Sequence, residues 1–280
     1  MNLNITLMKS RLAAILFAII LTASQALAAD PQLLVTAAHA HNDYEHTHPL
    51  FDALTNGFCS VEADISLIDG KLLVAHKPSE TSPEKTLQRL YLDPLRAQVK
   101  ANGGRVYPNG PEFTLLIDLK QSYKIIYPSL HDVLTNYSDM LVTFTRSPSG
   151  EEIKQTNAII VIITGDRDDD MFANETIRYA SIDGELPELA KNPPAALVPW
   201  ISTNWKKSFH WKGQGTMPAA EFAQLQLIVK QAHEQGRRVR FWGAPDNENT
   251  WRLLNGAGVD LINTDNLPGV ANFFRNESKS

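Results

Sequence analysis

Two short acidic patterns in the sequence have the spacing of metal ligands. Glu62 and Asp64 are separated by one residue in an apolar segment, and side chains two positions apart on a strand point to the same face. Asp118 and Lys120 repeat this spacing in a second apolar segment. Carboxylates buried side by side repel each other, and a divalent cation relieves the repulsion. Because oxygen ligands favour Mg²⁺ or Ca²⁺ over zinc, we expect Glu62, Asp64 and Asp118 to bind one of these two ions.

Histidines near these carboxylates would supply proton transfer. His41 follows the first predicted strand, and His76 ends a strand that doubles back from the first acidic pattern. Two histidines beside a metal-held phosphodiester provide a general base and a general acid near neutral pH. Lys120 would add a fixed positive charge for a phosphate oxygen. A buried ion pair between Asp118 and Lys120, and purely structural histidines, are the alternatives at this point.

Elements that could bring these groups together alternate along the chain. Short β-branched and apolar runs are followed by longer amphipathic segments, which is the pattern of strands and helices. The predicted strands cover residues 33–38, 58–68, 71–75, 113–119, 141–144, 158–163, 179–182, 197–201, 238–242 and 259–262. The predicted helices cover residues 48–56, 83–101, 128–137, 150–156, 218–235 and 247–255. Repeated strand–helix units imply parallel strands, and about eight of them in one domain imply a closed α/β barrel of the TIM (β/α)8 type.

The loops at one end of such a barrel carry its active site. Asp69 and Gly70 predict a tight turn that folds the strand at 71–75 back along the strand at 58–68. The aromatic-rich segment 200–211 is predicted to be a loop that either walls the site or packs against the barrel. Because no internal repeat, low-complexity tract or linker divides the sequence after the first 29 residues, we expect one barrel domain over residues 30–280.

The first 29 residues have the composition of a secretory signal peptide. Lys9 and Arg11 precede an apolar run over residues 12–21, and small residues at 26–29 match an A-x-A cleavage site. We therefore predict a signal peptide over residues 1–29 and export to the periplasm or the cell exterior, with an uncleaved membrane anchor as the alternative. No later segment of the sequence is long and apolar enough to span a bilayer.

Charge and cysteine content argue against some functions. The formal net charge of −5 becomes about −7 once residues 1–29 and their two basic side chains are removed. An acidic chain with dispersed charge does not suit nucleic-acid binding, which needs a basic surface. The single cysteine, Cys59, excludes an internal disulfide and is expected to be a small buried hydrophobe.

The order of these residues resembles that of the glycerophosphodiester phosphodiesterase and PLC-like phosphodiesterase superfamily. The matching positions are His41, Glu62, Asp64, His76, Asp118 and Lys120, together with the closing segments 240–242 and 258–265. The resemblance runs from about residue 33 to residue 274. It implies a PLC-like barrel in which the two histidines are the acid–base pair, the three carboxylates bind metal and the lysine binds phosphate. The pattern HxHNDY at residues 39–44 is similar to that of the fungal altered-inheritance-of-mitochondria protein 6 family.

Two departures from the superfamily pattern bear on the substrate. Asn42 stands where the usual enzymes have an arginine after the first histidine, and the loss of that arginine removes a bidentate phosphate clamp. Asp118 stands where many members have glutamate, although the sphingomyelinase D-like branch resembles this chain in its Asp-x-Lys pattern. These departures affect the expected substrate more than the expected reaction class.

Five further residues are predicted to contact the substrate: His39, Asn42, Asp43, Trp242 and Asp265. If the first strand ends before them, His39 and His41 are both exposed on the same side. We favour His41 as the catalytic residue because His-Asn replaces the His-Arg of the superfamily, and His39 would be a further ligand or an orienting partner. Asp43 would line the mouth, with a turn or cap role as the alternative. Trp242 would stack on the substrate and Asp265 would bond a ligand hydroxyl, with core packing and helix capping as the respective alternatives.

Together these features predict an exported, metal-dependent phosphodiesterase. The expected substrate is a small phosphodiester of the glycerophosphodiester or phospholipid headgroup class, so a transient contact with a membrane surface is compatible with the prediction. Hydrolysis and cyclisation to a cyclic phosphate both fit the residues, and no obligate protein partner is expected. Two other functions suit a barrel. One is a glycosidase, whose two acids lie about 5–9.5 Å apart, and the other is a ligand-binding barrel without catalysis, which Asn42 favours.

Overall fold

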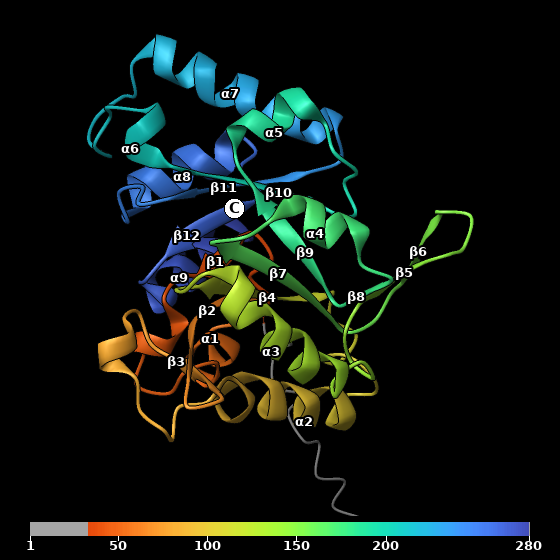
Figure 1. Cartoon of the computed structure of the whole chain (residues 1–280). Coiled ribbons are helices and arrows are strands. Elements are labelled where there is room, and N and C mark those ends of the chain that lie inside the picture. The colour runs from red at the N-terminus through yellow and green to blue at the C-terminus, as the bar shows by residue number, and fades with distance from the viewer. Residues whose placement is uncertain (1–32, 280) are drawn as a thin grey trace, which may run out of the picture. The chain divides into compact units, whose positions relative to one another are not determined.

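Eight parallel strands close into a barrel in the computed structural model, which describes residues 33–279 (Figure 1). In barrel order the strands are β1 (Ala38–Ala40), β2 (Ser60–Ile68), β4 (Phe113–Leu119), β7 (Ile159–Gly165), β9 (Ala180–Gly184), β10 (Trp200–Asn204), β11 (Arg238–Trp242) and β12 (Leu261–Thr264). Strand β1 pairs in parallel with both β12 and β2, and this pairing closes the barrel. The predicted (β/α)8-type barrel is confirmed, whereas the predicted signal peptide lies outside the described residues.

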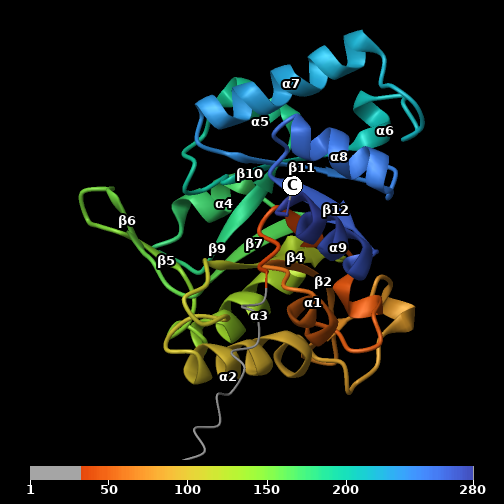
Figure 2. The same ribbon diagram turned by 180° about the vertical axis from the view of Figure 1, so that it is seen from behind.

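Helices surround the barrel strands, as the front and back views show (Figures 1 and 2). The α-helices are α1 (Phe51–Thr55), α2 (Asp93–Ala101), α3 (Tyr123–Thr135), α4 (Asp169–Asn174), α5 (Leu186–Lys191), α6 (Trp205–Ser208), α7 (Ala219–Glu234), α8 (Glu248–Gly256) and α9 (Leu267–Glu277). A π-helical segment, η3 (Gln88–Leu92), runs directly into α2, and short 3-10 turns lie at η1 (Asp43–Glu45) and η2 (Pro78–Glu80). Within residues 33–279, none of the helices combines the length and the apolar character that a membrane crossing requires.

A tight hairpin carries the second predicted histidine back to the barrel. Strand β3 (Lys71–Val74) pairs antiparallel with β2, and Asp69 and Gly70 form the turn with positive φ angles of 49° and 73°. Positive φ at both turn residues matches the right-handed twist of the flanking strands, and Asp-Gly adopts it readily. The backbone amide of the residue before His76 donates to the carbonyl of Asp64 at 3.1 Å. The predicted hairpin is therefore confirmed, and it places His76 beside the first acidic pattern.

Side chains of the barrel strands alternate between the interior and the surrounding helices. Val61, Ala63 and Ile65 of β2 belong to the apolar layer between strands and helices. Because successive strand residues point to opposite faces, Glu62 and Asp64 point into the barrel. The predicted inward orientation of this acidic pair is confirmed.

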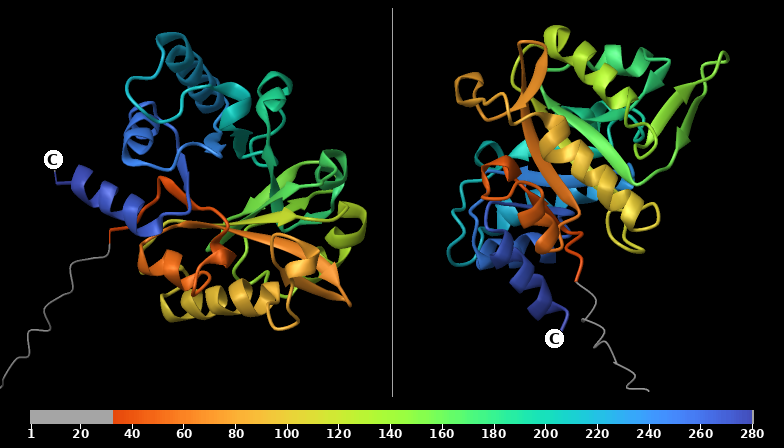
Figure 3. Two further views of the ribbon diagram at one scale, coloured as in Figure 1. Left: turned by 90° about the vertical axis from the view of Figure 1, so that its left-hand side faces the viewer. Right: turned by 90° about the horizontal axis from the view of Figure 1, so that it is seen from below.

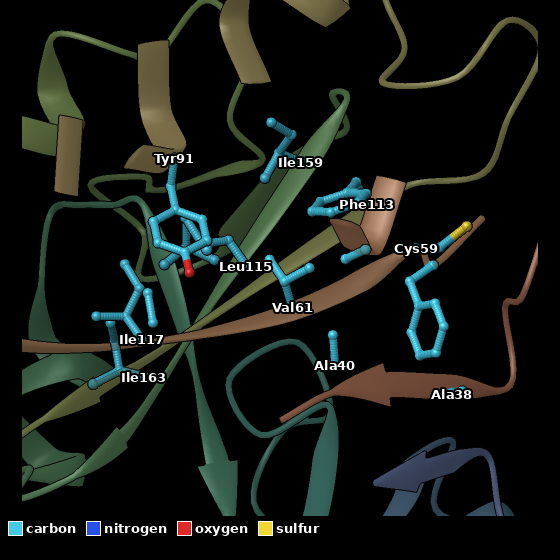
Figure 4. Packing of buried hydrophobic residues seen from close by; sticks show 14 of the residues in the cluster. Ala38, Ala40, Cys59, Val61, Tyr91, Phe113, Leu115, Ile117, Ile159 and Ile163 are labelled. Atoms are coloured by element: carbon cyan, nitrogen blue, oxygen red, sulfur yellow. The ribbon is translucent and has the colours of Figure 1, made fainter. Parts of the chain in front are cut away.

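The apolar layer outside the barrel is the main core of the protein. Figure 4 shows Leu115 and Ile117 of β4 close to Ile163 of β7, with Tyr91 of η3 beside them. Helix α2 lies alongside β2 in both views of Figure 3. Full burial of an aliphatic side chain contributes about 1.5–3 kcal/mol. Many such side chains together, rather than any single contact, therefore hold the helices on the barrel.

The barrel interior has an apolar half and a polar half. The apolar cluster, which also includes side chains from the small sheet described below, contains Leu116, Val142, Phe144, Ile160, Ile162, Trp200 and Leu261. Further along the same strands the inward side chains are polar, among them Glu62, Asp64, Asp118, Thr164, Asp183, Ser202, Arg240 and Asn263. The polar half lies toward the carboxyl ends of the strands, which is the end where barrels of this type place their active sites.

A small antiparallel sheet takes the place of two predicted elements. The predicted helix over residues 150–156 is wrong, because Glu152–Gln155 form strand β6, which pairs with β5 (Thr143–Arg146). Strand β5 also pairs with β8 (Ile177–Arg178), and this sheet projects from the barrel in Figures 1 and 2. The predicted strand at 141–144 thus contributes mainly to this sheet. A seven-residue helix is marginal by itself, and the cross-strand hydrogen bonds stabilise the strand instead.

The aromatic-rich segment 200–211, predicted to be a loop, consists mainly of β10 and α6. Trp205 and Trp211 are only 1% and 7% exposed, and the Trp205 indole donates to the Trp211 carbonyl at 2.9 Å. The packing alternative therefore holds for these two aromatic residues. Asn204 and Lys207, from the same segment, line a cavity at the barrel mouth.

Several other element boundaries are shifted from the prediction, among them those of the first barrel strand and of α3. The first barrel strand covers residues 38–40 rather than 33–38, because its register with β12 pairs only Ala38, His39 and Ala40. Helix α3 begins at Tyr123, before the predicted start at residue 128, and contains Pro128. The shift of the first strand matters most, because it places His39 inside the barrel wall.

Candidate active site

Three carboxylates converge at the carboxyl end of the barrel. Glu62 and Asp64 point inward from β2, and Asp118 lies opposite Asp64 in the β2–β4 pairing. One oxygen from each of the three lies within 4.8 Å of the others. Glu62 and Asp64 are buried, and Asp118 is partly buried, so three acidic groups share a space that water reaches poorly. Such a set of oxygen donors fits Mg²⁺ or Ca²⁺.

Asp64 is hydrogen-bonded through only one of its two oxygens. Its Oδ2 atom accepts from the Tyr44 hydroxyl at 2.7 Å and the His76 ring at 3.0 Å, and lies 2.7 Å from Lys120 Nζ. Its Oδ1 atom is buried and has no hydrogen-bond partner within residues 33–279. Burial and the charges of the other two carboxylates raise the pKa of Asp64. A bare, buried oxygen beside two more carboxylates is what a cation ligand requires, so the residues present fit a divalent ion.

Lys120 places a positive charge between two of the carboxylates. Its Nζ atom lies 2.7 Å from an oxygen of Asp64 and 2.7 Å from an oxygen of Asp118. Burial alone would lower the pKa of Lys120, but the charge of Asp118 and the hydrogen bonds to both carboxylates outweigh burial and raise it. Lys120 is therefore protonated at neutral pH. The predicted placement of Asp118 and Lys120 on one face is confirmed by their contact.

Glu62 is held inside the barrel by a hydrogen bond and by an ion pair with a residue of a distant strand. Its Oε2 atom accepts from His39 Nε2 at 3.2 Å and from Arg240 Nη1 at 3.3 Å. Arg240 Nη2 also donates to Asp183 at 3.2 Å. Burial alone would raise the pKa of Glu62, but the His39 hydrogen bond and the Arg240 charge outweigh burial and lower it. Glu62 is therefore ionised, which a cation ligand requires.

His41 is paired with Asp265 at the mouth of the barrel. Its Nδ1 atom donates to Asp265 Oδ1 at 2.8 Å, and its amide donates to the Thr264 carbonyl, so the pairing of β1 with β12 sets the contact. Burial alone would lower the pKa of His41, but the hydrogen bond to Asp265 and the charge of Glu62 outweigh burial and raise it. The side chain is 26% exposed. Its Nε2 atom has no hydrogen-bond partner in the described part of the chain.

His76 forms a second imidazole–carboxylate pair. Its Nδ1 atom donates to Asp64 Oδ2 at 3.0 Å, and half of its side chain is exposed. Both histidines thus bind a carboxylate through Nδ1, which fixes the ring orientation and leaves Nε2 for another molecule. Two oriented imidazoles beside an acidic triad have the chemistry of a general base and a general acid.

The residues of the HxHNDY pattern connect these groups. Asn42 has left-handed backbone angles, φ 47° and ψ 39°, a conformation that asparagine tolerates better than most residues. Its Oδ1 atom lies 2.9 Å from the Tyr44 hydroxyl, which is also 2.7 Å from Asp64 and 3.4 Å from His76. Tyr44 is buried. It therefore holds Asp64 in place beside His76.

Two family models match the two parts of the sequence that contribute residues to this site. A model described as the AIM6-like phosphodiesterase domain matches residues 29–183, which is more than half of the chain and includes both acidic patterns. The chain belongs to the AIM6-like phosphodiesterase family. A second model, of the glycerophosphoryl diester phosphodiesterase family, matches residues 238–268, which contain β11 and β12. The resemblance drawn from the sequence motifs is confirmed by these two matches.

Fungal members named altered inheritance of mitochondria protein 6 are similar over most of their length. The protein from Eremothecium gossypii is 28% identical over 281 residues, covering 86% of this chain and 70% of the fungal chain. The protein from Saccharomyces cerevisiae is 29% identical over 280 residues, covering 82% of this chain and 68% of the fungal chain. The names of these relatives state no enzymatic activity.

Solved structures of glycerophosphodiester phosphodiesterases are similar over most of both chains. One from Agrobacterium tumefaciens has a TM-score of 0.49 and 14% identity, covering 86% of this chain and 99% of that chain. One from Parabacteroides distasonis has a TM-score of 0.49 and 12% identity, covering 87% of this chain and 97% of that chain. The barrel assignment itself rests on the strand pairing described above.

Two of the predicted substrate contacts are placed away from the solvent. His39 was expected to be exposed, but it lies within β1 and is fully buried, with Nε2 on Glu62 and Nδ1 accepting from Ser60 at 2.7 Å. Burial lowers the pKa of His39 to about 4, so the ring is neutral at physiological pH. The expected exposure is wrong because the strand continues through His39, and the orienting role is the one that its contacts support.

Asp43 does not line the mouth as expected. Its side chain is buried, and its Oδ2 atom accepts from the Leu50 amide at 2.5 Å and the Tyr91 hydroxyl at 2.8 Å. Burial raises the pKa of Asp43 to about 6. The alternative role in the turn is therefore the correct one, because Asp43 connects the loop after β1 to a helix behind the barrel.

The other predicted contacts lie at the barrel mouth. Trp242 ends β11, is 39% exposed and lines a cavity beside Asp118. Asp265 is largely exposed and holds His41, a contact that differs from the expected hydrogen bond to a ligand. Asn42 is turned toward Tyr44.

The sequence reasoning missed Arg240, Asp183 and Arg167 as residues of the site. Arg240 and Asp183 are buried across the barrel from Glu62. The sequence pattern could have indicated Arg240. It alternates with apolar residues along β11, so its side chain faces the same side as that of Trp242. Arg167 follows β7 in a loop whose approach to Asp118 no local pattern indicates.

Replacement of the carboxylate beside His41 is expected to lower the pKa of that histidine. In Asp265→Asn, His41 loses an ionic partner while burial continues to disfavour its charged form, so its ring should titrate at lower pH than in the wild type. NMR titration of the His41 ring measures this directly. The control is Asp260→Asn, which changes the His233–Asp260 pair at the other end of β12. The pKa of His41 should be the same in this variant as in the wild type. An unchanged titration in Asp265→Asn would contradict the pairing.

A side chain at position 165 is expected to weaken cation binding. Gly165 has φ of +82°, and a Cβ there would collide with the Asp118 carboxylate and the Leu119 backbone. We expect Gly165→Ala to weaken Mg²⁺ or Ca²⁺ binding by about 10- to 100-fold, the usual effect of disturbing a ligand's support, as measured by isothermal titration calorimetry. Gly70→Ala has similar backbone strain at φ +73° with no atom within 4 Å and should bind normally. Equal affinities in the two variants would refute the proposed role of Asp118.

Proposed function

We propose that the protein is a phosphodiesterase that requires a divalent cation. The observation that supports this most directly is the presence of two imidazole–carboxylate pairs, His41–Asp265 and His76–Asp64, at the acidic triad. Lys120 adds a positive charge in contact with the same carboxylates. Membership of a phosphodiesterase family supports the reaction class.

The acidic triad would hold the cation. Glu62, Asp64 and Asp118 offer oxygen donors only, which suits Mg²⁺ or Ca²⁺. When bound, such an ion stabilises negative charge on phosphoryl oxygens. Lys120 would stabilise the same developing charge from the protein side, because it remains protonated at neutral pH.

The two histidines divide the proton transfers between them. The raised pKa of His41 keeps more of its ring protonated near neutral pH, so we assign it as the general acid. His76 is then the general base. It takes the proton of the attacking hydroxyl as the new P–O bond forms, and His41 gives a proton to the leaving alcohol as the old P–O bond breaks.

The substrate that we propose is a small phosphodiester of the glycerophosphodiester or phospholipid headgroup class. The attacking oxygen comes either from water or from a hydroxyl of the substrate itself. Attack by water gives a phosphomonoester, and attack by a substrate hydroxyl gives a cyclic phosphate, so ³¹P NMR of the product separates the two routes. A phospholipid substrate would bring the barrel mouth to a membrane surface for the time of one turnover.

The two rival functions have less support. A glycosidase needs two acids about 5–9.5 Å apart with space between them, whereas one oxygen of each triad carboxylate lies within 4.8 Å of an oxygen of the other two. A barrel that only binds a ligand would have no use for two histidines held by carboxylates. His41 and His76 each have such a partner, which favours catalysis.

Purified protein with added Mg²⁺ or Ca²⁺ is expected to cleave bis-p-nitrophenyl phosphate, and chelation should abolish the activity. Glu62→Gln should lower turnover because it removes a negative ligand. His76→Ala should lower kcat by roughly 10²- to 10⁴-fold, the usual contribution of an acid–base residue. Release of p-nitrophenol measures each rate.

The matched control for the histidine variant is His48→Ala. The His48 side chain is 70% exposed and pairs with Asp52 on the surface, so this variant should keep wild-type activity. Turnover that resists both chelation and Glu62→Gln would contradict the cation requirement. Absence of turnover over a broad panel of lipid and glycerophosphodiester substrates would contradict the proposed activity.

We also propose that the protein is exported and loses residues 1–29. This rests on the basic start, the apolar run and the small residues before Asp30. Expression in a Gram-negative host with fractionation and intact-mass measurement should find a chain that begins near residue 30 in the periplasm or the medium. A version without residues 1–29 should stay in the cytosol. A full-length chain in the membrane or cytosolic fraction would instead support the uncleaved anchor or no export.

A further inference from the structure

A polar cavity of about 230 Å³ opens beside Asp118 at the barrel mouth. Its walls come from the carboxyl ends of β4, β7, β9, β10 and β11, as the residues that line it show. His41 follows β1 and His76 follows β3, on the remaining part of the mouth. Asp118 belongs both to the acidic triad and to this cavity. One arm of a phosphodiester held at the triad would therefore extend into the cavity.

The size and lining of the cavity suit a polar headgroup. Pockets for drug-sized ligands usually measure about 300–1,000 Å³ and are mostly apolar, and this cavity is smaller and more polar. Thr164, Ser202, Thr203 and Asn204 contribute hydroxyl and amide groups to its wall. Ser202 and Asn204 already accept hydrogen bonds from Arg240 and the Lys206 amide. A long acyl chain would still displace water from a wall that is mainly polar, so it does not fit here.

The carboxylates that line the cavity already have partners. Asp118 contacts Lys120 at 2.7 Å. Asp183 accepts from Arg240 through Oδ2 at 3.2 Å, whereas its buried Oδ1 atom has no hydrogen-bond partner within residues 33–279. The Glu185 side chain accepts from a backbone amide in the first turn of α5 and so caps that helix. Most of the negative charge in the wall is thus neutralised or held by the protein itself.

The two cations of the cavity are less fully paired than these carboxylates. Lys207 has neither an ion pair nor a hydrogen bond to its side chain within residues 33–279. Arg167 contacts Asp169 through Nε at 3.2 Å, its side chain is 13% exposed, and its two terminal nitrogens have no hydrogen bond in the described part of the chain. A guanidinium with free terminal nitrogens presents a planar pair of donors to phosphate or carboxylate oxygens.

We propose that this cavity is a headgroup subsite for an alcohol arm that carries a second anionic group, either a phosphate monoester or a carboxylate. Arg167 and Lys207 bind this anion, and Trp242, partly exposed at the rim, covers the arm. The inference rests on the proposed phosphodiesterase function and adds the class of headgroup to it. Arg167 and Lys207 would also supply positive charge for the substrate, which Asn42 does not provide in place of an arginine.

A matched series of substrates tests the subsite. The substrates are p-nitrophenyl phosphodiesters whose second arm is 2-phosphoethyl, 2-carboxyethyl, ethyl or choline, so the leaving group is the same in all four. The wild-type protein should prefer one or both anionic arms over the ethyl arm by about 10- to 100-fold in kcat/KM, the range of a charge-assisted hydrogen bond. The difference should appear mainly in KM. The 2-phosphoethyl and 2-carboxyethyl arms distinguish the two kinds of anion.

Variants of the two cations should remove this preference. In Arg167→Gln and in Lys207→Gln, the ratio of kcat/KM for an anionic arm to that for the ethyl arm should fall toward one. Lys206→Gln, which changes an exposed lysine of the same helix that does not line the cavity, should keep the wild-type ratio. Arg167 is partly buried, and its variant could fail to fold. Lys207 is exposed, so Lys207→Gln should fold and would still test the subsite in that case.

Each outcome separates this inference from the proposed function. If none of the four substrates is turned over, the phosphodiesterase proposal fails. If all four are turned over with equal kcat/KM, the phosphodiesterase proposal stands and the anionic subsite is refuted. Preference for the choline arm also refutes it, and would mean that Asp183 and Glu185 select a cationic headgroup.

Discussion

The structure of the site depends on charges buried inside the barrel that must neutralise one another. Arg240 lies between Glu62 and Asp183, and the neutral His39 ring adds a hydrogen bond on the other side of Glu62. Removing one partner of a buried ion pair typically costs about 3–5 kcal/mol, so none of these residues is free to vary alone. Because Arg240 balances part of the negative charge, Glu62 stays ionised although it is buried. An acidic triad can therefore exist at the carboxyl end of the barrel without unfolding it.

The strand pairings that close the barrel set the positions of the residues in the candidate site. Pairing of β1 with β12 brings His41 to Asp265, residues that are 224 positions apart in the sequence. The β2–β3 hairpin returns the chain to Asp64, and the β2–β4 register sets Asp118 opposite Asp64. Each candidate catalytic group is thus placed by backbone hydrogen bonds of the sheet, while the segments after the strands add Arg167, Glu185 and Lys207 to a cavity whose wall is otherwise made of strand ends. This division is typical of barrels, in which a rigid scaffold supports variable loops.

Much of this arrangement was predictable from local patterns. The acidic pairs on strands, the Asp-Gly hairpin and the barrel itself follow from two-residue periodicity and strand–helix alternation, which are local properties. What local patterns could not indicate is long-range pairing. Strand β6 was predicted as a helix because its pairing with β5 is only seen in the folded sheet. His39 was expected in a loop because only the register with β12 extends the strand through it. Arg240 was not recognised as a charge partner, since its acceptors come from distant strands.

The replacement of arginine by Asn42 has a consistent explanation in this setting. The backbone at Asn42 is left-handed, and Asn42 Oδ1 and Asp64 Oδ2 are both acceptors within reach of the one Tyr44 hydroxyl proton. An arginine there would bring a long cation to a place that already contains Lys120. The cations of this site lie elsewhere than at position 42: Lys120 is among the carboxylates, Arg240 is beneath them, and Arg167 is at the opposite wall of the mouth. Under the proposed function, a guanidinium at the far wall rather than in the histidine loop leaves the two imidazole–carboxylate pairs intact and places a positive charge at the headgroup arm of the substrate. The proposed function and the proposed subsite thus assign reaction class and substrate choice to separate parts of the barrel mouth.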